Sequence, residues 1–250
     1  SKATILMPIT TPLVKIKAVK ELQAEVILFG ENYDESYEEA LRLSEERDLT
    51  FIHPFDDMEV IAGQGTIAVE IMSQLGDPPD SIYVAVGGGG LIAGILIYIK
   101  NLWPKTKIIG VEPEDADAMS KSLHANKIIE LENVGLFADG VAVKKVGKLT
   151  FEITKKYVDK IITVSNDEIC AAIKDVFEET RSILEPAGAL SIAGMKKDIV
   201  EEKYNELNLV AIACGANMNF ERLRFVAERA ELGEYKEAML AVEIPEKAGS

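Results

Sequence analysis

Short apolar runs alternate with longer amphipathic segments along most of the chain. The runs of strand length are Thr4–Met7, Glu25–Phe29, Thr50–Ile52, Ile82–Val86, Lys107–Glu112, Lys160–Val164 and Asn208–Ala213. The segments with apolar residues at helical spacing are Pro12–Leu22, Glu35–Glu46, Val60–Leu75, Leu91–Leu102, Lys148–Tyr157, Ala187–Tyr204 and Phe220–Glu231. Strands separated by helices pair in parallel through right-handed crossovers. The pattern therefore predicts an α/β protein with open, mostly parallel twisted sheets and helices on both faces.

One further helix and one irregular region complete the pattern. A long helix is expected after Asn166 or Asp167, either of which could cap it. The residues expected on its apolar face are Ile169, Cys170, Ile173, Val176, Phe177 and Leu184. Residues 126–147 show no clear period and are interrupted by glycines.

Changes in this pattern divide the chain into three parts. A boundary is expected near His53–Asp57, where the first strand–helix group gives way to a more apolar section. We expect residues 1–53 to form one small α/β subdomain and residues 54–233 a larger one. Residues 234–250 contain the strand-like run Ala238–Ile244, which no partner segment follows. A lone strand cannot satisfy its backbone groups, so both ends of the chain are expected to be cut rather than natural.

Composition and charge limit the classes of partner. Of 250 residues, 48% are hydrophobic and 28% charged, and the formal net charge is −15. A surface this acidic repels phosphate backbones and anionic lipids, so neither nucleic acid nor a membrane surface is expected to bind. Cys170 and Cys214 form no CxxC pair, which favours a reducing cytoplasm. We expect no cleavable signal sequence at the start of the chain.

The uncharged stretch Ile82–Ile99 contains the clearest chemical signal. Its length is nominally that of a membrane-spanning helix, but four consecutive glycines, Gly87–Gly90, interrupt it. A buried strand, a glycine turn and a buried helix fit better. Without side chains, successive amides can point toward one spot, where the helix N-terminus adds its positive end. The turn therefore predicts an anion site, most often one for phosphate.

The spacing around this turn allows more than one phosphate ligand. Gly88, Gly90 and Ala93 satisfy the dinucleotide-binding spacing, and Glu112 ends the next strand, where an acid could bind a ribose. A nicotinamide-dependent dehydrogenase is therefore one alternative, and a non-catalytic phosphate-binding module is another. Cys214 follows an apolar strand and is expected at the same sheet edge as the turn. Glu185 precedes a helix that begins with proline, where its charge could simply favour the helix dipole.

The two histidines give no metal signal. His53 precedes Pro54 at the expected boundary, and His124 lies in a polar helix. Neither has the neighbouring ligands that a metal site requires, so no metal is expected.

Taken together and in order, several segments resemble the biosynthetic threonine deaminases (threonine dehydratases). These are fold type II pyridoxal-phosphate enzymes, related to the β-subunit of tryptophan synthase. The matching residues are Met7-Pro8, Thr11-Pro12, Pro54-Phe55-Asp56, Ile61–Thr66, Val86–Leu91, Gly110–Pro113, Phe137–Val143, Leu184–Ala189 and Gly215–Asn217. The resemblance extends over the whole chain and implies two α/β subdomains.

The resemblance also implies roles for particular residues. Gly87, Gly88, Gly89, Gly90 and Leu91 would bind the phosphate of pyridoxal 5'-phosphate through their amides. Cys214 would lie beside the pyridine nitrogen, and Glu185 is expected among the cofactor-binding residues. The implied reaction removes water from L-threonine and gives 2-oxobutanoate and ammonia, a step of isoleucine biosynthesis.

Some of the family's features have no match in the chain. The Schiff-base lysine belongs to a segment expected upstream of residue 1, so the catalytic residue is unknown and the chain alone is expected to be inactive. Serine racemase relatives use an acid six residues after Glu112 for a metal, and Ala118 stands there. Residues 234–250 resemble the joint and first strand of a truncated ACT-like, allosteric domain. The family is usually dimeric or tetrameric, which implies a homo-oligomer with a small amino acid as substrate.

Overall fold

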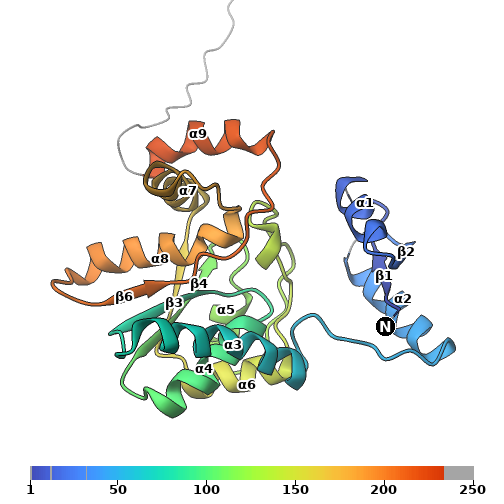
Figure 1. Cartoon of the computed structure of the whole chain (residues 1–250), viewed down its shortest axis with the longest axis horizontal. Coiled ribbons are helices and arrows are strands. Elements are labelled where there is room, and N and C mark those ends of the chain that lie inside the picture. The colour runs from blue at the N-terminus through green and yellow to red at the C-terminus, as the bar shows by residue number, and fades with distance from the viewer. Residues whose placement is uncertain (1, 12, 32, 234–250) are drawn as a thin grey trace, which may run out of the picture. The chain divides into compact units, whose positions relative to one another are not determined.

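The computed structural model describes residues 2–11, 13–31 and 33–233 of the chain (Figure 1). The chain divides into two compact units between His53 and Pro54. Each unit has its own parallel sheet.

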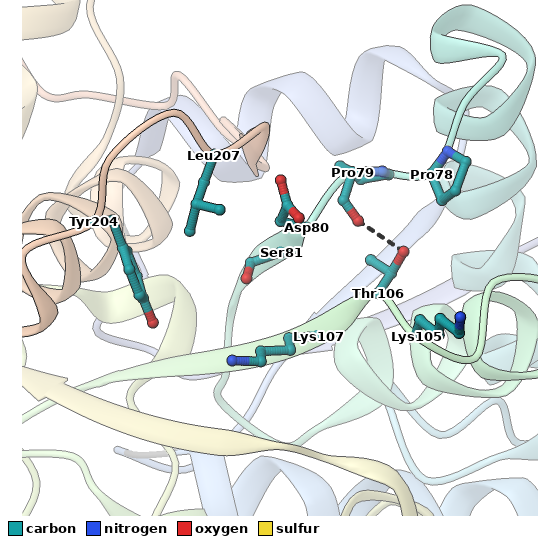
Figure 2. Close-up of a pocket in the computed structure, with 9 residues that line it drawn as sticks. All are labelled: Pro78, Pro79, Asp80, Ser81, Lys105, Thr106, Lys107, Tyr204 and Leu207. Carbon is teal, nitrogen blue, oxygen red and sulfur yellow. Dashed lines mark hydrogen bonds between the residues drawn. The ribbon is translucent and has the colours of Figure 1, made fainter.

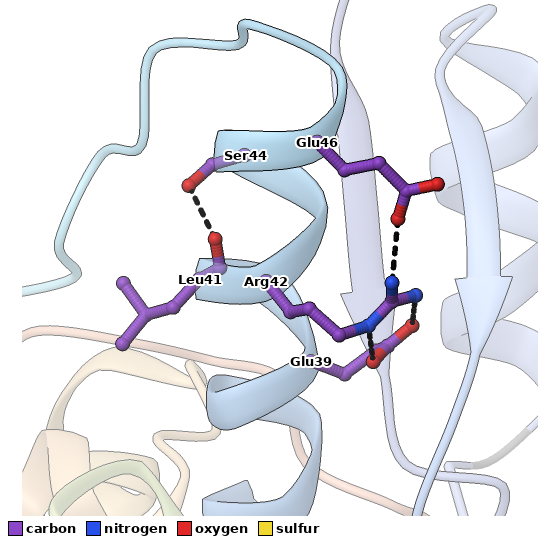
Figure 3. Close-up of polar contacts among 5 residues, drawn as sticks. All are labelled: Glu39, Leu41, Arg42, Ser44 and Glu46. Carbon is purple, nitrogen blue, oxygen red and sulfur yellow. Dashed lines mark hydrogen bonds and ion pairs between the residues drawn. The ribbon is translucent and has the colours of Figure 1, made fainter.

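The first unit has two strands and two helices: β1 (Thr4–Met7), α1 (Leu13–Glu21), β2 (Glu25–Leu28) and α2 (Tyr33–Glu46). The strands are parallel, with Thr4 beside Glu25 and Met7 beside Leu28. On α2, Arg42 bonds both oxygens of Glu39 at 2.7 Å and Glu46 at 2.5 Å (Figure 3). These side chains are largely exposed except Glu39, so the cluster orders the surface of the helix more than it stabilises the fold.

The predicted strand Thr50–Ile52 is wrong. Its residues pair with no strand in the part of the chain that the structure describes. Aromatic contacts occur here instead: the Phe51 ring packs edge-on against Tyr37, with centroids 5.6 Å apart, and lies near the His53 ring. A short apolar run can therefore reflect ring packing rather than a sheet.

The second unit contains a four-stranded sheet in the order β5-β4-β3-β6, with every neighbouring pair parallel. The strands are β3 (Ser81–Ala85), β4 (Lys107–Pro113), β5 (Lys160–Val164) and β6 (Leu209–Ala211). The helices are α3 (Met58–Leu75), α4 (Gly90–Leu102), α5 (Ala118–Ala125), α6 (Lys148–Tyr157), α7 (Asn166–Thr180), α8 (Pro186–Glu202) and α9 (Arg222–Gly233), with a 3-10 turn η1 (Asp139–Val141). The predicted α/β fold class is confirmed.

Helices cover both faces of this sheet, which is why its central strands are continuously apolar. Tyr83 and Val111 face a core that includes α7, α8 and α9. Ile82 and Ile108 face a second core, with α4 and parts of α3, α5 and α6. Figure 1 shows these two layers on opposite sides of the strands. With both faces covered, the sheet can place chemistry only at its edges and strand ends.

Helix α7 corrects the prediction for its ends. Ser165, rather than Asn166 or Asp167, is the N-cap, and it forms a reciprocal capping box with Glu168. The helix stops at Thr180 because Arg181 adopts a left-handed conformation, with φ of 60°. Leu184 therefore lies beyond the helix, and Phe177 is 43% exposed.

The expected joint and ACT-like strand fall on residues 234–250, outside the described residues. Within the described ranges, no helix is both long and apolar enough to cross a bilayer.

Candidate functional site

The glycine turn lies between the carboxyl end of β3 and the start of α4. Gly89 has a φ of 94° and is the N-cap of α4, a conformation that glycine adopts without steric cost. The turn thus aims the positive end of a 13-residue helix toward the carboxyl edge of the sheet.

Close packing explains why this turn needs glycine. A Cβ atom at Gly88 would lie 2.4 Å from the Phe55 ring, and one at Gly90 would lie 3.0 Å from the Cβ of Phe55. A Cβ atom at Gly89 would lie 2.8 Å from the Cβ of Thr150. The glycines therefore allow protein to pack tightly against one side of the turn. The sequence did not reveal these packing partners.

The backbone amides of the glycine turn differ from the Gly88 carbonyl in their hydrogen bonding. In the part of the chain that the structure describes, the amides of residues 87–91 donate no hydrogen bond to another protein group. The Gly88 carbonyl, in contrast, accepts from Thr150 Oγ1 at 2.6 Å and from the Gly147 amide at 3.2 Å. Successive unused amides at a helix N-terminus form an anion-binding nest. This geometry supports the predicted phosphate site.

Cys214 leaves the sheet at the same edge as the glycine turn. Strand β6 is parallel to β3, and the Ile212 amide donates to the Tyr83 carbonyl at 3.1 Å. The Cys214 amide then donates to the Gly188 carbonyl on α8 at 3.3 Å. Adjacent parallel strands end at the same edge of a sheet. Cys214 therefore lies at the same end of the sheet as Gly87, although the two residues are 127 positions apart in the sequence.

Glu185 holds the segment around Cys214. Its amide donates to the Gly215 carbonyl at 3.1 Å, and its Oε2 accepts from the Asn217 amide at 3.2 Å. Glu185 is the N-cap of α8, yet its side chain forms no capping bond to that helix. Its carboxylate therefore orders residues 214–217 rather than capping its own helix.

The thiol of Cys214 is kept protonated by its surroundings. Burial raises the pKa of Cys214 above the usual value, and the nearby carboxylate of Glu185 raises it further. A neutral, weakly polar group therefore lies at this position near neutral pH.

The turn η1 lies between the glycine turn and Glu185. A Cβ atom at Gly87 would lie 2.9 Å from Val141 Cα, and one at Gly140 would lie 3.7 Å from Glu185 Oε1. The sequence predicts no regular element here, because residues 126–147 show no clear period. The structure adds that this turn packs against both predicted site segments.

Glu112 contradicts the dinucleotide alternative. Its side chain is fully buried, and its oxygens accept from the amides of Met119 and Ser120, at 2.8 and 2.7 Å, at the start of α5. The carboxylate that the spacing assigned to a ribose is therefore engaged inside the protein. Spacing alone could not show which way this side chain points.

The histidines have ordinary surroundings. His124 is exposed, and its Nδ1 lies 2.9 Å from the Ser120 carbonyl, while the His53 ring packs near Tyr37. No group of three or more His, Cys, Asp or Glu side chains that could bind a metal occurs among the described residues.

A pocket of about 310 Å³ lies at the opposite end of the sheet (Figure 2). Ser81 and Lys107, which line it, are the first residues of β3 and β4. It therefore lies at the amino ends of the strands, away from the glycine turn. The full lining is Pro78, Pro79, Asp80, Ser81, Lys105, Thr106, Lys107, Tyr204 and Leu207.

The chain is similar in sequence to known pyridoxal-phosphate enzymes. Residues 1–215 match the sequence model of the family described as pyridoxal-phosphate dependent enzymes. The whole chain is 56% identical to the biosynthetic L-threonine dehydratase IlvA of Burkholderia multivorans, of which it covers 50%. It is 55% identical to the mitochondrial threonine dehydratase of Schizosaccharomyces pombe, of which it covers 42%. The chain thus spans about half the length of these curated relatives.

Solved structures give the same result. Over 92% of this chain, the processed form of threonine deaminase isoform 2 from Solanum lycopersicum superposes with a TM-score of 0.90 at 50% identity, and 63% of that chain is covered. Over 88% of this chain, serine racemase from Dictyostelium discoideum superposes with a TM-score of 0.79 at 35% identity, and 70% of that chain is covered. No support for a nicotinamide-dependent dehydrogenase emerges. The chain belongs to the pyridoxal-phosphate dependent enzyme family.

Proposed function

We propose that this chain carries the phosphate-binding part of an enzyme that converts L-threonine to 2-oxobutanoate and ammonia. The observation that carries the proposal is the glycine turn, whose amides donate to no group in the described part of the chain and lie at the edge where Cys214 and Glu185 also lie. Identity of 51–56% to biosynthetic threonine dehydratases over nearly the whole chain supports the substrate.

The residues at this edge fit pyridoxal 5'-phosphate. A phosphate ester is an anion that prefers several convergent amides, which residues 87–91 offer. We assign the phosphate to the amides of Gly87, Gly88, Gly89, Gly90 and Leu91. Cys214 would lie beside the ring nitrogen, and Glu185 would hold the Cys214 segment in place.

These residues would also tune the cofactor. When bound, pyridoxal phosphate supplies an electron sink for the bonds that break at the substrate. Because the Cys214 thiol stays protonated, this residue would place no negative charge beside the ring nitrogen. A moderate electron sink suits elimination of the substrate hydroxyl, which needs less electron withdrawal than transamination.

A chimera tests the proposed reaction. The half of the Burkholderia multivorans relative that this chain matches is replaced by the chain, and 2-oxobutanoate formation from L-threonine is measured. We expect turnover that depends on pyridoxal phosphate, within roughly tenfold of the intact relative. The relative with that half deleted is the negative control. A folded chimera that deaminates L-serine but not L-threonine would reject threonine as the substrate, and one inactive on both would reject the reaction.

Compartment and assembly complete the proposal. We place the protein in the cytoplasm because both cysteines are free thiols, as a reducing compartment favours. We expect a homo-oligomer with no nucleic-acid or membrane partner, in keeping with the net charge of −15. Light scattering on the purified protein measures the assembly state.

A further inference from the structure

One carbonyl in the glycine turn is held by two donors. The oxygen of Gly88 accepts from Thr150 Oγ1 at 2.6 Å and from the Gly147 amide at 3.2 Å. The Thr150 side chain is fully buried, and its other oxygen contact, to the Gly147 carbonyl, is longer at 3.2 Å. The hydroxyl is therefore directed chiefly at the turn.

The orientation of the Gly88 carbonyl also determines the orientation of the Gly89 amide. In a trans peptide the C=O of one residue and the N–H of the next point in opposite directions. Because the Gly88 oxygen points toward α6, the Gly89 N–H must point away from it. Gly89 has a φ of 94°, so its backbone can adopt this arrangement without strain. The two donors thus turn the Gly89 amide away from the protein packed behind the turn.

Asp56 holds Thr150 in place. Its carboxylate accepts from the first three amides of α6: those of Lys148, Leu149 and Thr150, at 2.9, 2.8 and 3.3 Å. A carboxylate at a helix N-terminus satisfies amides that otherwise have no partner and complements the helix dipole. The first turn of α6 is therefore anchored to the segment that also places Phe55 against Gly88.

We propose that Thr150 and Asp56 are positioning residues for the cofactor phosphate: through the Gly88 carbonyl they orient the Gly89 amide toward the phosphate. This inference rests on the proposed function, because it assumes that the turn binds a phosphate ester. Neither side chain contacts the phosphate itself. Their effect passes through one peptide plane.

The test measures binding rather than turnover. Pyridoxamine 5'-phosphate has the ring and the phosphate of the cofactor but no aldehyde, so it cannot react with lysines. Its dissociation constant is compared with that of pyridoxamine, which lacks the phosphate. The variants are Thr150→Val, which removes the hydroxyl at nearly constant volume, and Thr150→Ser, which keeps it.

Thr154 provides a matched control. It lies one turn further along α6, is equally buried, and its hydroxyl has no hydrogen-bond partner within the described part of the chain. We expect Thr150→Val to weaken pyridoxamine 5'-phosphate at least about tenfold and to leave pyridoxamine unchanged. Thr150→Ser and Thr154→Val should bind both compounds like the wild type, and Asp56→Asn should show a smaller, phosphate-specific loss.

Each outcome decides between the inference and the proposed function. Wild-type affinity for pyridoxamine 5'-phosphate in Thr150→Val would overturn the inference while leaving the phosphate site standing. Equal weakening of both compounds in that variant would show a general packing defect and also overturn it. A wild-type chain that does not prefer the phosphorylated compound would overturn the proposed function, and the inference with it. If Thr150→Val does not fold, the change in the Gly89 amide chemical shift on adding phosphate is compared between the wild type and Asp56→Asn. A smaller change in the variant supports the inference, and a change equal to that of the wild type contradicts it.

Discussion

The two ends of the four-stranded sheet each have a fully buried carboxylate, and the two are treated differently. Toward the amino ends, Asp198 accepts from the Tyr83 hydroxyl at 2.7 Å and pairs with Lys160 at 2.6 Å. At the carboxyl ends, the Glu112 side chain accepts hydrogen bonds from the backbone amides of Met119 and Ser120, at 2.8 and 2.7 Å. Asp198 has a cation as its partner, whereas burial raises the pKa of Glu112 to about 8 and favours its protonated form.

The difference reflects how each end uses its polar groups. Toward the amino ends, hydroxyl, ammonium and carboxylate groups satisfy one another, which serves the fold. At the carboxyl ends the amides of the glycine turn donate to no protein group among the described residues, and the Cys214 thiol is kept neutral. Successive backbone donors without protein acceptors at a helix N-terminus are typical of an anion-binding site. Changes toward the amino ends should therefore lower stability, and changes in the glycine turn should alter binding.

The largest effect is expected from Asp198→Ala. Removing this carboxylate leaves the buried Tyr83 hydroxyl without its partner and the partly exposed Lys160 ammonium with Glu202, at 3.0 Å, which should cost about 2–4 kcal/mol of unfolding free energy. Urea unfolding measures the loss. The affinity of the folded variant for pyridoxamine 5'-phosphate should be unchanged. A loss below about 1 kcal/mol would show that the buried pair stabilises little.

Gly89→Ala should damage both stability and binding. The added Cβ would lie 2.8 Å from Thr150 and 2.8 Å from Met119 Cε, at a φ that alanine rarely adopts. We expect a loss of about 1–3 kcal/mol in unfolding free energy, together with weaker phosphate binding. Gly63→Ala on α3 is the control, because its Cβ would meet nothing within 4 Å, and it should be neutral or stabilising. Equal effects of the two substitutions would contradict the packing argument.

Glu112 should make stability depend on pH. Burial raises the pKa of this carboxyl from 4.5 to about 8, while the amides of Met119 and Ser120 oppose the rise. Between these two values the unfolded chain releases a proton that the folded chain keeps, so stability falls as pH rises. Unfolding free energy should be about 2 kcal/mol lower at pH 6.5 than at pH 5, relative to Glu112→Gln. Parallel pH profiles of the two proteins would show that Glu112 is ionised throughout.

Arg42→Ala tests an exposed ion pair, for comparison with the buried carboxylate of Asp198. Its guanidinium contacts Glu39 and Glu46 on the surface of α2 (Figure 3), where water and salt screen the charges. We expect a loss below about 1 kcal/mol in thermal unfolding, much less than for Asp198→Ala. A loss as large as that of Asp198→Ala would show that burial does not determine how much the two ion pairs stabilise the fold.

Sequence patterns predicted the local elements well. The strand, glycine turn and helix from Ser81 to Leu102 follow from one apolar run interrupted by glycines, and the fold class follows from the alternation. The predicted end of α7 was wrong because Arg181 adopts a left-handed conformation, which its residue type does not indicate. The strand expected at Thr50–Ile52 was wrong because its apolar character reflects ring contacts.

Contacts between distant residues were not predictable. Thr150 bonds Gly88 across 62 positions, and Asp56 bonds the start of α6 across more than 90. Glu112 had the spacing of a ribose-binding acid, but its side chain bonds the start of α5. A single sequence gives the residue types available at a strand end and not the direction in which a side chain points.

The most direct test of the central claim is a titration of the isotopically labelled chain with pyridoxamine 5'-phosphate, followed by amide chemical shifts. The account predicts that the largest shifts occur at Gly87–Leu91, with smaller ones near Cys214. Shifts concentrated instead at Ser81 and Lys107, in the pocket at the amino ends of the strands, would contradict it.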